Sequence, residues 1–159
     1  MSEDITFVGL DVHKESIAVA SLVGQAPVAD AQVFVMENTP DALKRLAKRL
    51  LSNGGAPRAC YEAGPCGYAA YRQLTELGVP CEVIAPSLIP KKPGDHVKTD
   101  RRDAVQLARL LRSGDLQPVY VPRPEDEAIR DLSRACEAAR SDQKDAKLRL
   151  NSFLLRHDV

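Results

Sequence analysis

The amino-acid sequence predicts an α/β domain with a mixed sheet, in the order β-β-β-α-β-α-β-α, followed by one long helix. Three observations support this fold class. Short β-branched apolar runs fill the start of the chain, separated only by short polar turns. Helical apolar stripes then alternate with further short apolar runs. Finally, the sequence after Pro124 contains neither Gly nor Pro. The 159 residues are enough for one domain with a real core.

The first three strands form a meander. Residues 5–12, 16–23 and 28–36 are each rich in apolar and β-branched side chains, which is typical of strands. The sequences "HKE" and "GQAP" between them are short and polar. Such short connections join antiparallel neighbours, so we expect an antiparallel arrangement.

Helices and strands alternate after the meander. Thr39 is a suitable N-cap for the first helix, Pro40 fits its first position, and the Asn53-Gly54-Gly55 sequence ends it. Its apolar stripe comprises Leu43, Leu46, Ala47, Leu50 and Leu51. The remaining elements are expected to be a strand at 58–63, a helix from about Pro65 to Gly78, a strand at 79–86 and a helix at 99–112.

The segment from Pro124 to about His157 is expected to be one helix, with acids crowded into its first turn. Its apolar residues recur at steps of three, four or seven: Ala128, Leu132, Ala135, Ala139, Ala146 and Leu150. A helix this long with so narrow a stripe indicates a coiled-coil arm or a linker helix. The alternative is a helix that packs across the domain.

Composition limits the possible functions. Lys plus Arg equals Asp plus Glu at 22 each, which argues against general affinity for nucleic acids but leaves room for a local basic patch. No apolar run approaches the roughly 20 residues of a membrane span, and the N-terminus lacks the basic region of a signal peptide. The spacing of the four cysteines matches no zinc template, which favours reduced thiols in a cytosolic protein.

Four acids stand out by their positions. Asp11 ends the first strand, and Glu62 lies near the end of the fourth. In a meander followed by α-β units, these two strands commonly lie side by side and parallel, so their carboxyl ends meet at one sheet edge. Asp100 and Asp103 are three residues apart and share one face of a helix. If that helix packs against the same edge, four carboxylates converge.

Converging carboxylates repel one another unless cations lie between them. Hard oxygen ligands suit Mg²⁺ or Mn²⁺, and two such ions about 4 Å apart can assist phosphoryl transfer. Seven bases against three acids lie between Lys91 and Arg112. Six bases are candidates for contacts with nucleic-acid phosphates: Lys14, Lys91, Lys92, Lys98, Arg101 and Arg102.

Several residues of this region also have an ordinary structural interpretation. Asp11 can be a turn residue, Asp100 an N-cap or first-turn acid, and Asp103 the partner of a base one helical turn away. His13 fits a polar hairpin turn, although it can also face a substrate.

Three segments carry a resemblance to a known family: "FVGLDVHKESIAVA", "YEAGPCGYAAYRQL" and "KTDRRDAVQLARLL". The chain resembles the N-terminal DEDD domain of the bridge-RNA-guided insertion-sequence transposases, or recombinases. The resemblance implies a RuvC-like, RNase H-like fold, with Asp11, Glu62, Asp100 and Asp103 as catalytic acids that bind Mg²⁺ or Mn²⁺. It also implies action on DNA, a guide RNA, and a location in the bacterial cytoplasm.

The resemblance further implies a domain organisation. Residues 1–115 would form the catalytic domain, and residues 116–159 an extended linker and the start of a long helix that assembles homo-oligomers. The family's C-terminal domain, which carries a nucleophilic serine, is expected to be absent from these residues.

Metal-dependent DNA cleavage and strand transfer in transposition is therefore the leading hypothesis. The alternative is a non-catalytic module for nucleic-acid binding and assembly. Sugar-kinase and actin-like ATPases also begin with a strand ending in "GLD", but here "VHKE" stands where they need a phosphate-binding loop.

Overall fold

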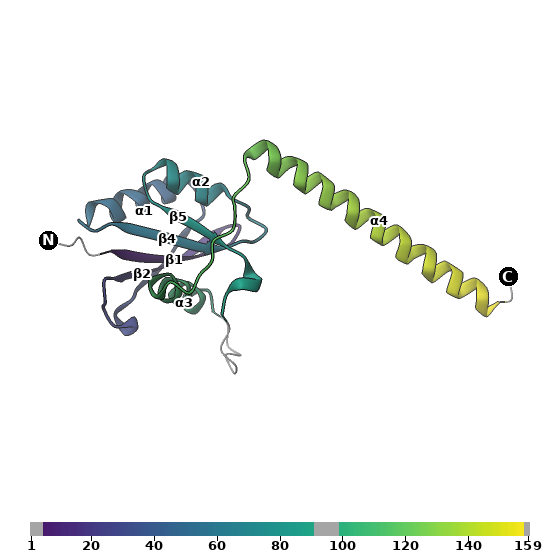
Figure 1. The fold of residues 1–159 in the computed structure, drawn as a ribbon, viewed down its shortest axis with the longest axis horizontal. Coiled ribbons are helices and arrows are strands. Elements are labelled where there is room, and N and C mark those ends of the chain that lie inside the picture. The colour runs from purple at the N-terminus through teal and green to yellow at the C-terminus, as the bar shows by residue number, and fades with distance from the viewer. Residues whose placement is uncertain (1–4, 91–98, 158–159) are drawn as a thin grey trace. The chain divides into compact units, whose positions relative to one another are not determined.

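The computed structural model describes residues 5–90 and 99–157. It divides into two compact units, residues 1–120 and 121–159. The first unit contains the strands and the helices α1, α2 and α3 (Figure 1). The second unit contains the helix α4.

The first unit is built on a five-stranded sheet in the order β3-β2-β1-β4-β5. The antiparallel part comprises β1 (Thr6–Val12), β2 (Ser16–Val23) and β3 (Gln32–Glu37). On the other side of β1, β4 (Pro57–Glu62) and β5 (Cys81–Ile84) run parallel to it. An antiparallel meander followed by two parallel strands is the RNase H-like arrangement, so the predicted fold class is confirmed.

Helices cover both faces of this sheet (Figure 1). One face is covered by α1 (Pro40–Ser52) and α2 (Ala69–Glu76), and the other by α3 (Asp100–Ser113). The Thr39 hydroxyl caps α1 by accepting a hydrogen bond from the Ala42 N–H at 3.3 Å, as the sequence predicts. Gly114 ends α3 in the left-handed conformation, with φ at 77°.

Two predicted boundaries are wrong, for local reasons. The third strand was expected to start at Val28, but Val28–Asp30 forms the 3-10 turn η1. The turn is closed by a hydrogen bond from the Asp30 N–H to the Pro27 carbonyl. The second helix was expected from about Pro65, but α2 begins at Ala69 because Gly67 takes a φ of 65°, which a helix cannot contain.

Two of the four free cysteines lie in the core. Cys60 and Cys81 are buried, Cys66 is half-buried and Cys136 is exposed. Burial raises the pKa of the Cys60 thiol far above its ordinary value and that of Cys81 to about 12. Such thiols remain protonated and unreactive, which agrees with their expected structural role.

The second unit contains α4 (Pro124–Arg156), the long helix that the sequence predicts. It has no buried residue. Six large apolar side chains on it are exposed: Ile129, Leu132, Leu148, Leu150, Phe153 and Leu155. Among the helices in the described part of the chain, none combines the length and apolar character that a membrane crossing requires.

The packing of α3 on β1 depends on Gly9. A Cβ atom added at Gly9 would lie 2.1 Å from the Ala104 carbonyl oxygen and 2.6 Å from the Ala108 nitrogen. Both atoms are helix backbone and cannot rotate away. Ala104 and Ala108 are themselves fully buried, in a cluster with Ala18, Ala20 and Leu22 of β2. Small side chains on both elements therefore allow α3 to lie directly on the sheet.

We expect Gly9→Ala to force α3 away from β1 and to lower the free energy of unfolding by about 1–3 kcal/mol or more. Urea unfolding followed by the tyrosine near-ultraviolet signal measures this, because all four tyrosines lie in the first unit. Gly64→Ala is the control, since its Cβ would meet only the Glu62 carbonyl oxygen at 3.9 Å. Equal losses in both variants would contradict the proposed contact.

Candidate metal centre

Asp11 lies at the carboxyl end of β1, where alternation along the strand puts it on the same sheet face as Gly9. That face is the one covered by α3. The Asp11 side chain retains 20% of its accessible surface, so it is largely but not completely enclosed. Its position therefore combines a partly dry environment with an opening to solvent.

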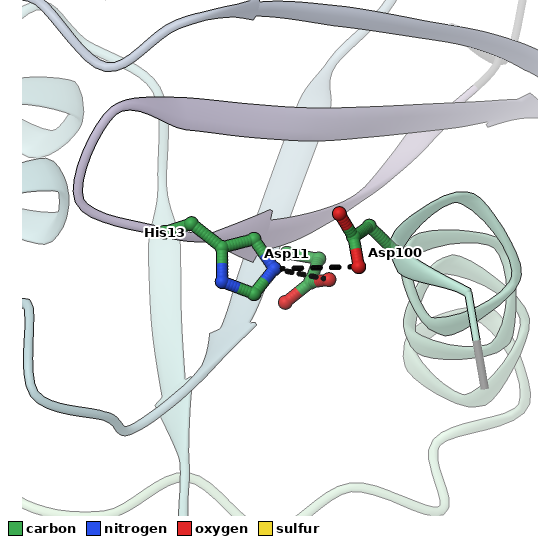
Figure 2. A group of neighbouring side chains, drawn as sticks. All are labelled: Asp11, His13 and Asp100. Carbon is green, nitrogen blue, oxygen red and sulfur yellow. Dashed lines mark hydrogen bonds and ion pairs between the residues drawn. The ribbon is translucent and has the colours of Figure 1, made fainter.

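Asp100 is the first residue of α3. The Thr99 hydroxyl caps this helix by accepting a hydrogen bond from the Arg102 N–H at 3.4 Å. A carboxylate in the first turn is favoured by the partial positive charge of the helix N-terminus. Because α3 packs closely on β1, this first turn lies beside the end of the strand, and the Asp100 carboxylate lies near Asp11 (Figure 2).

His13 completes this group (Figure 2). Its Nε2 atom lies 3.1 Å from Asp11 Oδ2 and 3.5 Å from Asp100 Oδ1. One ligand atom from each of the three residues lies within 4.8 Å of the others. The imidazole thus bridges two carboxylates that come from distant parts of the chain.

This donor set fits a divalent cation. Carboxylate oxygens suit Mg²⁺ and Mn²⁺, and an imidazole nitrogen is a common ligand of transition metals. Ligand atoms on adjacent corners of an octahedron with metal–ligand bonds of about 2.1 Å lie about 3.0 Å apart. The two separations from His13 Nε2, 3.1 and 3.5 Å, are close to this spacing.

The local electrostatics agree with a cation site. Burial is the largest influence on Asp11 and raises its pKa; His13 lowers it, and Asp100 and Asp103 raise it further. For His13, burial lowers the pKa, but the carboxylates of Asp11 and Asp100 more than offset this, and the net pKa is raised. Positive charge is therefore favoured at this point in the structure.

The other two predicted acids lie nearby but outside this close group. Asp103 is half-buried one turn further along α3. Its negative charge raises the pKa of Asp11. Glu62 is exposed at the end of β4. The last β1–β4 pair is Leu10 with Tyr61, so Glu62 is one residue beyond it, at the level of Asp11.

The predicted basic residues are only partly described. Lys14 is exposed in the turn after β1, and Arg101 and Arg102 are exposed in the first turn of α3. All three therefore border the group formed by Asp11, His13 and Asp100. Lys91, Lys92 and Lys98 lie outside the described residues.

His13 is the residue whose role the sequence left undecided, with a polar turn as the first interpretation. A signal was present in its spacing, because residues two apart in an extended chain point to the same face. His13 follows Asp11 by two residues just after β1 ends at Val12. What the sequence could not supply was the position of Asp100, which makes the imidazole a bridge.

We expect the stability of the metal-free chain to depend on pH through His13. Because the folded-state pKa of His13 is raised, its stabilisation is complete below about pH 6.5 and is lost as the pH rises through the folded-state value. The raised pKa of Asp11 also lowers stability as the pH rises, but it does so from the lower pH range in which a carboxyl titrates. Thermal unfolding with a chelator, between about pH 6 and pH 8, should therefore show a steeper fall in stability for the wild type than for His13→Ala.

The control for this measurement is His157→Ala. His157 lies at the end of α4, with its ring centroid 4.6 Å from that of Phe153. This variant should keep the wild-type dependence on pH. Identical pH dependence in the wild type and in His13→Ala would contradict the assigned interaction.

Comparison with known proteins places the chain in a family. A transposase family profile, that of the DEDD domain of IS110 transposases, matches residues 8–157. The y4qE protein of Sinorhizobium fredii, named as a transposase, is 43% identical over 95% of this chain and 39% of its own length. The transposase for insertion sequence element IS1533 of Leptospira borgpetersenii is 40% identical over 96% of this chain and 44% of its own length. The chain thus spans about two fifths of the length of these relatives.

Two solved structures are also similar. Thermus thermophilus RuvC has a TM-score of 0.48 and 13% identity, covering 72% of this chain and 99% of RuvC. The large terminase nuclease of thermophilic phage G20c has a TM-score of 0.37 and 17% identity, covering 70% of this chain and 56% of the nuclease chain. The family assignment depends instead on the sequence match, which extends over nearly all of the chain: this protein belongs to the DEDD-domain family of IS110 transposases.

Proposed function

We propose that this chain carries the metal-dependent part of DNA strand cleavage and transfer in the transposition of an insertion sequence. The observation that carries the proposal is the convergence of Asp11 and Asp100 at the carboxyl end of β1. Membership of a transposase family and the names of both relatives support it.

Four acids form the proposed ligand set for Mg²⁺ or Mn²⁺: Asp11, Glu62, Asp100 and Asp103. Asp11 is fixed by the central strand, and Asp100 and Asp103 by one face of α3. Glu62 would enter from the adjacent strand, and its exposed side chain has freedom to turn toward the ion. Two ions held in this way would activate the attacking oxygen and stabilise the leaving oxygen of a phosphodiester.

The bases around this group are proposed to bind the DNA backbone. Lys14, Arg101 and Arg102 border the acids on exposed turns, where they can reach phosphates next to the reacting one. Lys91, Lys92 and Lys98 are included on sequence grounds. Because the net charge of the whole chain is zero, DNA would be attracted to this region and not to the surface in general.

The wider organisation is also a proposal. Residues 1–115 would form the catalytic domain, and residues 116–159 the linker and long helix. The six exposed apolar side chains of α4 support assembly of the chain into a homo-oligomer through this helix. A guide RNA as a further partner, and action in the bacterial cytoplasm, are proposed from the family resemblance alone.

A second candidate function is a non-catalytic module for nucleic-acid binding and assembly. The observation that favours it is the position of Glu62, which lies outside the close group of Asp11, His13 and Asp100. A nuclease assay with branched and duplex DNA separates the two functions. Intact DNA binding with no cleavage at any divalent metal concentration would favour the module.

We expect Asp11→Asn and Asp100→Asn each to reduce Mn²⁺ and Mg²⁺ binding below detection in calorimetry, because each removes a charged oxygen ligand. The matched control is Asp41→Asn. Asp41 also lies in the first turn of a threonine-capped helix, but it is 82% exposed and faces Lys44 at 3.9 Å. Wild-type protein that binds neither ion at millimolar concentration would overturn the proposed metal-dependent function.

We expect Arg101→Ala to weaken duplex DNA binding and to lower the slope of log affinity against log salt by about 1, as for the loss of one phosphate contact. Fluorescence anisotropy over a range of salt concentrations measures both quantities. Lys48→Ala removes the same charge from α1, on the opposite face of the sheet, and should leave the slope unchanged. Equal effects of the two substitutions would indicate non-specific attraction.

A further inference from the structure

The imidazole of His13 points at the two acids that the proposed function relies on (Figure 2). We propose that His13 Nε2 is itself a ligand of the metal ion held by Asp11 and Asp100, and that this nitrogen makes the site prefer Mn²⁺ over Mg²⁺. The inference rests on the proposed function, since it concerns the same metal centre. It assigns a role to a residue that lies outside the set of four acids.

The geometry already approximates that of a coordination shell. The Nε2 atom is 3.1 Å from Asp11 Oδ2 and 3.5 Å from Asp100 Oδ1, the approximate spacing of ligand atoms around one ion. Nε2 is within hydrogen-bonding distance of Asp11 Oδ2 and forms an ion pair with Asp100 Oδ1 when the imidazole is protonated. A neutral imidazole with its proton on Nδ1 would offer the Nε2 lone pair at the same point.

Hydrogen bonds hold the backbone of the turn that carries His13. The His13 N–H donates to the Ser16 carbonyl at 2.9 Å, which closes the turn between β1 and β2. The side-chain amide of Asn38 donates to the His13 carbonyl at 2.7 Å. The Asn38 N–H in turn donates to the Glu15 carbonyl at 3.0 Å. Asn38 therefore ties the turn to the end of β3, which limits the entropy lost when His13 binds a metal.

The consequence is selectivity between ions. Carboxylates alone accept both Mg²⁺ and Mn²⁺, whereas imidazole suits transition metals and is a poor partner for Mg²⁺. A shell with one nitrogen and several carboxylate oxygens thus favours Mn²⁺. A site of the four acids alone would show a smaller difference between the two ions.

The competing role for His13 is that of a cationic placeholder. In that case the imidazole would neutralise the carboxylates only while the site is empty, and a metal ion would displace it. The two roles make opposite predictions, because removing a ligand weakens binding, whereas removing a competitor strengthens it.

The test measures Mn²⁺ and Mg²⁺ affinities by calorimetry for the wild type, His13→Ala and the control His157→Ala, at a pH about two units above the ordinary histidine pKa. If His13 is a ligand, His13→Ala should lower Mn²⁺ affinity by about tenfold or more while changing Mg²⁺ affinity by less than about threefold. Pulsed electron paramagnetic resonance of bound Mn²⁺ should also detect a coordinated nitrogen, and His13→Ala should abolish that signal.

The possible results separate this inference from the proposed function. An unchanged Mn²⁺ to Mg²⁺ ratio in His13→Ala, a gain in affinity for both ions, or no nitrogen signal in the wild type would overturn the ligand role and leave the four-acid site standing. A wild type that binds neither ion would overturn both proposals. The control His157→Ala should match the wild type in every measurement, since His157 is the C-cap residue of α4, in the second unit.

Discussion

The close packing of α3 on β1 at Gly9 is the contact on which the candidate site depends. The backbone of α3 approaches the strand so closely that no Cβ atom fits between them. This short distance brings the first turn of the helix to the end of the strand, where Asp100 lies near Asp11. With a larger side chain at position 9, the same residues would form a helix and a strand, but their acids would be farther apart.

The site that results is unfavourable for stability unless positive charge occupies it. Burial raises the pKa of Asp11, and the charges of Asp100 and Asp103 raise it further. Such an arrangement costs folding free energy, which is common where residues are positioned for function. In the metal-free protein the His13 imidazole offsets part of this cost by bridging Asp11 and Asp100. A divalent cation would offset more, since it carries two charges and binds several oxygens at once.

The first turn of α3 carries both acids of the proposed metal site and bases of the proposed DNA contact. Asp100, at the start of α3, is exposed but lies within reach of Asp11 and His13, and Asp103 is half-buried, whereas Arg101 and Arg102 are exposed in the same helical turn. Helical periodicity produces this division, because residues next to each other in sequence are about 100° apart around the axis. In the proposed function, this one turn of helix would therefore offer carboxylates beside the end of β1 and guanidinium groups in other directions around the helix axis.

The sequence by itself determined the elements and the residue types of the site. Apolar periodicity, the Thr39 cap and the glycine stops predicted every helix and strand, and the boundaries differed mainly where local turns intervened, at Val28–Asp30, before Ala69, and at Pro86, where η2 (Pro86–Leu88) follows the shorter strand β5 (Cys81–Ile84). The position of Asp11 at the end of its strand, and of Asp100 at the start of its helix, followed from the same local signals. These features depend on neighbouring residues, which is why one sequence reveals them.

Only the tertiary structure decided which of these side chains meet. The distance between Asp11 and Asp100 depends on how closely α3 approaches β1, and that is set by Gly9, Ala104 and Ala108, residues far apart in the chain. The role of His13 depends on a turn that Asn38 holds by a hydrogen bond to the His13 carbonyl. It also depends on the position of Asp100, which α3 places 3.5 Å from His13 Nε2. Contacts between distant segments leave no periodic signal in a single sequence, so the bridging imidazole became evident only in the folded chain.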